Sequence, residues 1–240
     1  MVQVCLNGAR SRSECAHLPV TPRELAEAAA RAVAAGAVDI HLHPKDRDGR
    51  DSLEAEHVDA AVAAVRAAVP GIPVGVTTGA WTAADARERA AHVQSWTVLP
   101  DHASVNWHEE GAAQVADALL ARGIGIEAGI YSGADGLARF SAWPRADRAL
   151  RVLAEVTDVH PRTAPGTAEA LLEELAAATA LPILLHGEDG AAWHVLRLAA
   201  ARGLATRIGL EDTLFLPDGS AAADNAVLVL AARQIIGRSE

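Results

Sequence analysis

Short apolar runs alternate with longer amphipathic segments along all 240 residues of this chain, and no other feature restricts its fold as strongly. Strands and helices differ in side-chain period, so the pattern separates the two kinds of segment. We expect strands over Val2–Leu6, Val38–His43, Pro73–Thr77, Ala103–Asn106, Gly125–Glu127, Leu150–Val156, Pro182–His186 and Arg207–Glu211. A helical segment follows each strand, at a repeat of roughly 30 residues. This alternation predicts parallel strands with right-handed crossovers, and hence one domain over residues 1–240, an α/β protein of the (β/α)8 TIM-barrel class.

The helical segments carry recognisable start signals. We expect helices over Leu25–Ala35, His57–Val69, Thr82–Ser95, Gly111–Ala121, Thr167–Ala178, Gly190–Ala201 and Ala221–Ile236, with residues 133–148 irregular around a short helix. In Thr21-Pro22-Arg23-Glu24, an N-cap threonine precedes a proline at the first helical position and a glutamate three residues after the cap. Ser52 is expected to cap the second helix. An open, doubly wound sheet is the alternative fold, but no G-x-G-x-x-G follows the first predicted strand.

Charge and composition argue against several classes of function. Hydrophobic residues make up 50% of the chain and charged residues 22%, as in an ordinary globular domain. A net charge of −10 argues against broad binding to nucleic acid or anionic membranes. Cys5 and Cys15 match neither a disulfide framework nor a zinc finger, so we expect buried thiols in a cytoplasmic protein. We also expect no signal peptide and no membrane span, because the chain shows no sufficiently long apolar stretch.

Two histidines close the second predicted strand. Side chains alternate along Val38–His43, so Asp39, His41 and His43 share one face, and Pro44 ends the strand because it has no N–H to donate. Neutral imidazole is the commonest protein ligand for zinc and similar metals, so this pair predicts a metal site. The alternative is two polar side chains on a half-exposed strand, each with a hydrogen bond.

Polar residues end or follow most of the other predicted strands. The carboxyl ends of the strands in such a barrel meet at one rim, where its chemistry takes place. The residues expected there are Asn7, His41, His43, Thr77, Thr78, Asn106, Glu127, His186, Glu211 and Asp212. Each alone would more often be a structural residue, but together they predict a site.

The second informative stretch is Arg207-Ile208-Gly209-Leu210-Glu211-Asp212. Strand alternation would place Arg207 and Glu211 on one face, with Gly209 leaving space between them. The last strand of a closed barrel lies beside the first, so Glu211 can approach the two histidines and complete a metal site with open positions. A buried arginine would keep Asp212 ionised and oriented, which suits a general base. The alternative is an ion pair that only holds the rim together.

Taken with these motifs, the chain resembles the β-keto acid cleavage enzymes, whose type member is the 3-keto-5-aminohexanoate cleavage enzyme. The resemblance covers nearly the whole chain and rests on the segments Leu6–Ala9, Leu18–Glu24, His41–Asp46, Thr77–Gly79, Ser104–Asn106 and Arg207–Thr213. It implies a zinc-dependent, retro-Claisen-type reaction in which a β-keto acid and acetyl-CoA exchange fragments, giving acetoacetate and a new acyl-CoA. It also implies a homo-oligomer.

The same resemblance implies roles for individual residues. His41, His43 and Glu211 resemble the zinc ligands, and Asp212, oriented by Arg207, resembles the base. The residues that it implies for binding the substrate are Thr77, Thr78, Asn106 and Glu127, of which the two threonines stand where the family contacts the acid and keto groups. Glu127 resembles the acidic residue that reads the distal group of the substrate.

Two cations depart from the family pattern. Lys45 replaces the arginine of the usual H-x-H-x-R-D motif, and Arg10 stands where an acidic or polar residue is common. Glu127 has apolar neighbours, so its carboxylate needs a cationic or hydrogen-bonding partner. This partner could be a substrate ammonium, but we expect a protein cation such as Lys45 or Arg10.

Two other functions remain open from the sequence. A metal-dependent hydrolase of the amidohydrolase type also uses H-x-H on a barrel strand, although normally after the first strand, with later histidine ligands and a lone aspartate after the eighth. A non-catalytic barrel that binds a metal or small molecule is the other possibility. The polar cluster His186-Gly187-Glu188-Asp189 has no role that the pattern assigns.

Overall fold

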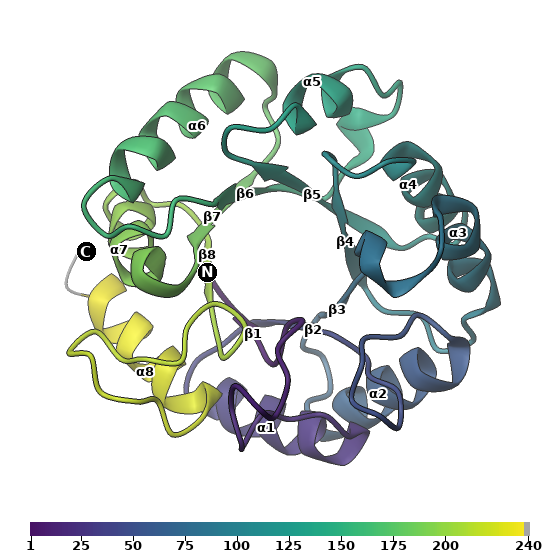
Figure 1. Ribbon diagram of the computed structural model, residues 1–240, viewed down its shortest axis with the longest axis horizontal. Coiled ribbons are helices and arrows are strands. Elements are labelled where there is room, and N and C mark those ends of the chain that lie inside the picture. Colours follow the sequence, from purple (N-terminus) through teal and green to yellow (C-terminus); the bar gives the residue numbers. More distant parts are fainter. Residues whose placement is uncertain (238–240) are drawn as a thin grey trace.

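The computed structural model describes residues 1–237, and its eight parallel strands form a barrel with helices around the outside (Figure 1). The strands are β1 (Val2–Cys5), β2 (Asp39–Leu42), β3 (Val74–Thr77), β4 (His102–Asn106), β5 (Gly125–Tyr131), β6 (Arg151–Val156), β7 (Ile183–Gly187) and β8 (Thr206–Ile208). Their order is β7-β6-β5-β4-β3-β2-β1-β8, and a parallel bridge between Leu184 and Ala205 brings β8 back to β7. The predicted (β/α)8 barrel is therefore confirmed, and the doubly wound sheet is wrong.

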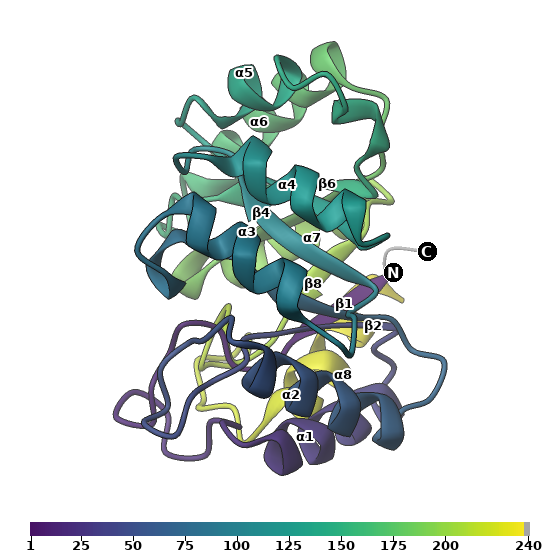
Figure 2. The ribbon, with the colours of Figure 1, turned by 90° about the vertical axis from the view of Figure 1, so that its right-hand side faces the viewer.

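A helix follows every strand. The α-helices are α1 (Pro22–Ala34), α2 (Ala55–Ala68), α3 (Ala86–Ser95), α4 (Ala112–Ala121), α5 (Gly136–Ser141), α6 (Ala164–Ala178), α7 (Ala192–Ala201) and α8 (Asn225–Ile236). Short 3-10 turns lie at Ala80–Thr82, Ala146–Arg148 and Asp189–Ala191. Within residues 1–237, none of the helices has the length and apolar character needed to cross a membrane. Figure 2 shows the long loops after β1 and β2 on the left, at the end of the barrel away from the N-terminus.

The strands separate an aliphatic outer layer from a polar interior. On β1 and β2, the buried side chains of Val4, Ile40 and Leu42 belong to the hydrophobic core, whereas Asp39 and His41 make polar contacts with residues of other strands. The structure thus confirms the alternation predicted for β2. Burying the aliphatic layer supplies the main favourable term in folding.

Helix starts follow local capping chemistry. The Thr21 side chain accepts from the Glu24 N–H and Glu24 reaches back to the Thr21 N–H, so the predicted capping box at α1 is confirmed. The prediction for Ser52 is wrong, because α2 begins at Ala55 and Ser52 Oγ accepts from the N–H of Glu54, the N-cap residue. Helix α3 begins later than expected, at Ala86, because the Asp85 side chain caps it there.

Strand β5 is longer than the sequence predicted. It pairs with β4 and β6 along its length, to Asn106↔Gly129 on one side and to Tyr131↔Glu155 on the other. Glu127 therefore lies in the middle of the strand and below the rim. The prediction that Glu127 ends β5 is wrong, because the apolar run continues beyond it.

Strand β8 is shorter than predicted and ends at Ile208. The N–H groups of Asp212 and Thr213 both donate to the Gly209 carbonyl at 3.0 Å, which makes a turn. A Cβ atom at Gly209 would lie 1.9 Å from the Cys5 carbonyl oxygen, so glycine allows this turn to approach β1. Glu211 therefore lies in a turn and not in a strand. Gly209 leaves space for the backbone of Cys5, and does not serve to separate the side chains of Arg207 and Glu211.

Candidate functional site

The loop after β1 fixes the position of His43 through an amide pair. Asn7 Oδ1 accepts from the His43 N–H at 2.9 Å, and Asn7 Nδ2 donates to the His43 carbonyl at 2.9 Å. Asn7 Nδ2 also donates to the Pro19 carbonyl. Asn7, which the sequence predicted at the rim after β1, therefore positions His43, a predicted metal ligand.

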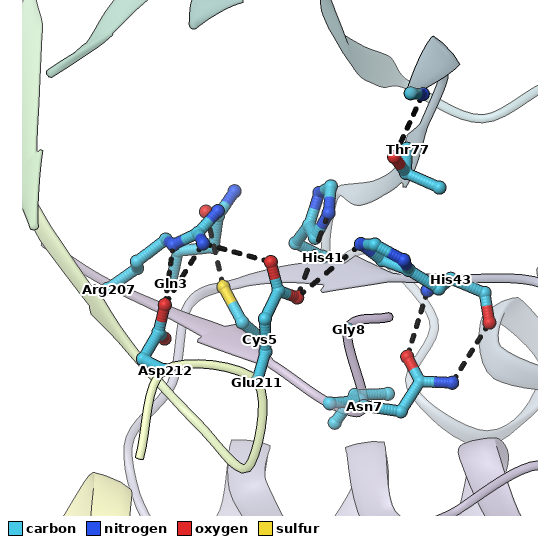
Figure 3. Close-up of polar contacts among 12 residues, drawn as sticks. Gln3, Cys5, Asn7, Gly8, His41, His43, Thr77, Arg207, Glu211 and Asp212 are labelled. Atoms are coloured by element: carbon cyan, nitrogen blue, oxygen red, sulfur yellow. Dashed lines mark hydrogen bonds and ion pairs between the residues drawn. The ribbon is translucent and has the colours of Figure 1, made fainter. Parts of the chain in front are cut away.

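The side chains of His41, His43 and Glu211 point toward one another (Figure 3). Glu211 Oε2 lies 3.9 Å from His41 Nε2 and 3.7 Å from His43 Nε2, and one ligand atom from each residue lies within 4.8 Å of the other two. This donor set, two imidazole nitrogens and a carboxylate oxygen, is suited to zinc and leaves a position open. The three predicted ligands therefore come together from β2 and the turn after β8.

The protonation states suit metal binding. Burial lowers the pKa of His41 to about 4, so its imidazole is neutral at pH 7. Burial alone would raise the pKa of Glu211, but Arg207 and the two histidines outweigh it and lower that pKa to about 2. Glu211 Oε1 accepts from Arg207 Nη2 at 2.9 Å, whereas the buried Oε2 has no hydrogen-bond partner within residues 1–237. A cation at this point would satisfy that oxygen.

Residues outside the ligand set hold two of the ligands in place. His43 Nδ1 lies 2.7 Å from Asp51 Oδ2, which directs its other nitrogen toward Glu211. Lys45 Nζ pairs with Asp51 Oδ1 at 2.5 Å. Gly8 has a φ of +59°, and a Cβ there would lie 2.5 Å from Glu211 Cγ, so only glycine fits beside that carboxylate.

Arg207 joins Glu211 to Asp212. Its Nε donates to Asp212 Oδ1 at 3.0 Å, while Asp212 Oδ2 has no hydrogen-bond partner in the described chain. His186 Nδ1 lies 3.5 Å from Asp212 Oδ1, and His186 Nε2 lies 3.4 Å from Glu155 Oε2. Burial and Arg207 oppose protonation of His186, but the two carboxylates outweigh them and raise its pKa to about 9. Asp212 is thus an oriented, fully buried carboxylate with one free oxygen.

The residues expected to bind substrate occupy different places. Thr77 and Asn106 line a cavity of about 370 Å³ at the rim, as do the three potential metal ligands. Thr78 is 1% exposed, and its hydroxyl donates to the Ser104 carbonyl at 2.7 Å. Thr78 therefore ties β3 to β4, while Thr77 and Asn106 face the cavity.

Glu127 lies beneath this cavity in a buried polar layer. Arg151 Nε donates to Glu127 Oε1 at 2.7 Å, and Gln3 Nε2 donates to the same oxygen at 3.1 Å. A protein cation does pair with Glu127, as expected, but it is Arg151. Lys45 instead pairs with Asp51, and Arg10 pairs with Asp189 at the cavity mouth. Both side chains therefore lie outside the buried polar layer that contains Glu127.

Sequence reasoning missed several residues of the cavity wall, which the structure places beside the predicted ones. They are Trp81, Ser104, Tyr131, Glu155 and Glu188. Glu155 follows an apolar run in β6, and Glu188 belongs to the cluster after β7 that had no assigned role. Their position after or near the strand ends was the available signal.

Comparisons with known proteins agree with this architecture. A family model described as beta-keto acid cleavage enzyme matches residues 1–240. The apo structure of ObcA has a TM-score of 0.75 and 20% identity, with 92% of this chain and 62% of that chain covered. A ternary complex of ObcA with a C4-CoA adduct and oxalate has a TM-score of 0.74 and 19% identity, with 92% and 64% covered. This chain therefore spans less than two thirds of the length of the ObcA chains.

A more distant likeness extends to another enzyme with this fold. The type I 3-dehydroquinate dehydratase from Clostridium difficile, with covalently modified comenic acid, has a TM-score of 0.68 and 10% identity. The match covers 99% of this chain and 90% of that one. At such identities, the structural likenesses show the barrel fold alone.

Proposed function

The chain belongs to the beta-keto acid cleavage enzyme family, and on this premise we propose that it is a zinc-dependent β-keto acid cleavage enzyme. In the proposed reaction, a β-keto acid and acetyl-CoA give acetoacetate and a new acyl-CoA. The carbon–carbon bond beside the keto group breaks, and the released two-carbon acid forms a bond to the acetyl carbon. The thioester sulfur moves from acetyl to the other acyl group, so atoms and electrons balance.

The observation that carries this proposal is the unpaired, buried Glu211 Oε2 between two histidine nitrogens. The neutral state of His41 and the ionised state of Glu211 fit a divalent cation. Zinc bound there would polarise the keto oxygen and stabilise negative charge that develops on it. The amidohydrolase alternative lacks comparable support, because the third ligand atom comes from Glu211 and no further histidine joins the described ligand group.

We assign the proton transfer to Asp212. Arg207 holds Asp212 Oδ1, and the free Oδ2 can take a proton from the attacking group of the substrate and return it as the fragments exchange. Arg207 also holds Glu211, so one guanidinium orients both carboxylates.

Substrate binding falls to Thr77 and Asn106 in this proposal, because both line the cavity. Thr78 helps to position them through the hydrogen bond that its hydroxyl donates to the Ser104 carbonyl of β4. Glu127 acts as a positioning residue beneath His41, whose Nδ1 lies 3.9 Å from Glu127 Oε2. The ObcA complexes with oxaloacetate and with a C4-CoA adduct support a keto acid and a CoA thioester as the substrate classes.

The proposal can be tested with zinc-loaded protein, acetyl-CoA and a panel of β-keto acids. We expect at least one acid to yield acetoacetate and the matching acyl-CoA, detected by mass spectrometry, and Asp212→Asn to form both products about a hundredfold more slowly or less. Formation of free acids and CoA would instead indicate a hydrolase. Unchanged acetyl-CoA with every acid of the panel would contradict the proposal.

A further inference from the structure

Trp81 is a half-exposed indole at the edge of the candidate metal site. It lies in the short 3-10 turn Ala80–Thr82, shortly after β3, and is 53% exposed. It lines the same cavity as His41, His43 and Glu211. The proposed reaction assigns no role to this side chain, yet its contacts connect it to one of the potential metal ligands.

The indole N–H reaches a carboxylate beside His43. Trp81 Nε1 donates to Asp51 Oδ2 at 2.8 Å, and the same oxygen lies 2.7 Å from His43 Nδ1. Lys45 Nζ donates to Asp51 Oδ1 at 2.5 Å and to the Gly8 carbonyl at 2.9 Å. The Asp51 side chain is 3% exposed, so contacts from three side chains converge on one buried carboxylate.

The two other contacts determine which nitrogen of His43 carries the proton. The indole nitrogen of Trp81 and the ammonium of Lys45 can only donate, so Asp51 accepts on both of its oxygens. In a neutral imidazole, His43 Nδ1 is then the nitrogen that donates to Asp51. His43 Nε2 keeps its lone pair and lies 3.7 Å from Glu211 Oε2, among the potential ligand atoms.

The ring of Trp81 also covers His43. The two rings are stacked, with their centroids 6.0 Å apart and their planes at 20° to each other. With this ring in place, His43 is 4% exposed. Removing the indole would open one face of the imidazole to water, and the apolar groups around a metal site control how water reaches it. Trp81 therefore contacts a potential ligand through its ring and orients the same ligand through its N–H.

Gly79 provides the space for this arrangement. A Cβ atom at Gly79 would lie 2.2 Å from both Cη2 and Cζ3 of Trp81. Gly79 has a φ of −57°, which any residue can adopt, so its backbone conformation does not require glycine. The missing side chain at Gly79 and the large one at Trp81 therefore fit each other.

We propose that Trp81 is a positioning residue of the metal site, which holds Asp51 as the acceptor for His43 Nδ1 and shields His43 from water. This inference rests on the proposed function, because it takes the metal to be bound by His41, His43 and Glu211. An indole outside the ligand set thereby determines how tightly this chain holds the metal. Trp81 acts on the metal only through Asp51 and His43.

Zinc affinity, measured by competition with a chromophoric chelator, tests this role without turnover. Trp81→Phe keeps a ring over His43 but removes the N–H, so the affinity should fall by roughly two- to tenfold, the effect of one lost hydrogen bond. Trp81→Ala also removes the ring, and its affinity should fall by about tenfold or more. Trp143→Phe is the matched control, because Trp143 Nε1 also donates to an aspartate, the half-exposed Asp117, and it should bind zinc as wild type does.

A second set of variants tests the fit between Gly79 and Trp81. Gly79→Ala should displace the indole and lower the zinc affinity several-fold. In the Trp81→Ala background the new methyl group meets no ring, so Gly79→Ala should have little further effect. Gly166→Ala is the control, because a Cβ there has no atom within 4 Å and should leave the affinity unchanged. Equal losses from Gly79→Ala in both backgrounds would overturn the role of the ring.

The stability of the metal-free protein separates a positioning role from a structural one. Metal-free Trp81→Phe should unfold at nearly the same urea concentration as wild type, because Trp81 is half exposed. A zinc affinity equal to that of wild type in Trp81→Phe would overturn this inference alone. A loss of affinity that only matches a loss of metal-free stability would make Trp81 structural and would overturn it as well. A wild-type protein that binds no zinc would overturn the proposed function too.

Discussion

Two polar regions lie one above the other inside this barrel, and they differ in how their charges are paired. In the buried polar layer, made of Gln3, Asp39, His102, Glu127 and Arg151, both oxygens of each carboxylate lie within 3.0 Å of a histidine or arginine nitrogen. At the rim, Arg207 lies within 3.0 Å of only one oxygen of Glu211 and one of Asp212, and the other oxygen of each has no hydrogen-bond partner within residues 1–237. Buried charges destabilise a folded protein unless they are compensated. We therefore interpret the buried polar layer as structural and the rim as a site that bound ligands complete.

Two buried histidines show the contrast most clearly. Burial would lower the pKa of His102, but Glu127 and Asp39 outweigh it and raise that pKa to about 10. His41, two strands away on β2, lacks such close partners, and burial lowers its pKa to about 4. One imidazole is therefore held as a cation in the polar layer, and the other is kept neutral, which is the state that a metal ligand needs.

Removing the arginine of the polar layer should have the largest effect on stability. Arg151→Leu leaves Asp39 and Glu127 buried without it, so we expect a loss of about 3–5 kcal/mol in unfolding free energy. Urea unfolding of the metal-free protein measures this loss. Arg145→Leu is the control, because Arg145 makes an exposed ion pair with Asp117 and should change stability by about 1 kcal/mol or less. Equal effects of the two substitutions would mean that the layer is not structural.

Alkaline pH should weaken the same layer. The pKa of His102 is about 10 in the folded protein, above its value when unfolded, so its contribution is complete below about pH 6.5 and is lost as pH rises through 10. Wild type should unfold with a larger free energy than His102→Gln, and this difference should decrease between pH 7 and 9, by at most about 1.4 kcal/mol per pH unit. Urea titrations at several pH values measure it. Parallel pH curves for the two proteins would contradict a cationic His102.

At the rim, substitutions should affect activity more than stability. Asp212→Asn keeps the size of the side chain but removes the base, so turnover should fall by about a hundredfold or more. Arg207→Lys should also impair turnover, because an ammonium cannot replace the planar fork that holds two carboxylates. Steady-state kinetics and the metal content of each variant would be measured together. Turnover close to wild type in Asp212→Asn would make that residue structural.

Asp51 tests how the site is oriented. Asp51→Asn weakens the contact that directs His43, so zinc affinity should fall by about 10- to 100-fold. Competition with a chromophoric chelator reports this affinity independently of activity. Asp117→Asn, on the outside of the barrel, should bind zinc as wild type does. An unchanged affinity in Asp51→Asn would show that the orientation of His43 has another origin.

The barrel and the shared face of His41 and His43 could be predicted from the sequence, because both depend on local patterns. Alternation over a few residues sets which face a side chain takes, so the shared face of His41 and His43 followed from β2 alone. Part of the cavity wall did not follow, because Tyr131, Glu155 and Glu188 join the predicted residues only through the curvature of the closed sheet. Glu211 does lie beside His41 and His43, as the sequence predicted. The turn that carries it depends on the close approach of Gly209 to Cys5, which local sequence patterns do not reveal.

The metal content of three purified proteins tests the central claim most directly. Wild type and His57→Ala should each bind about one zinc ion per chain, because His57 belongs to a separate, more exposed group with Glu54 and Glu56. Glu211→Gln should bind none under the same conditions while remaining folded by circular dichroism. Equal zinc in Glu211→Gln and wild type, or its loss in His57→Ala alone, would contradict the assignment of the metal site.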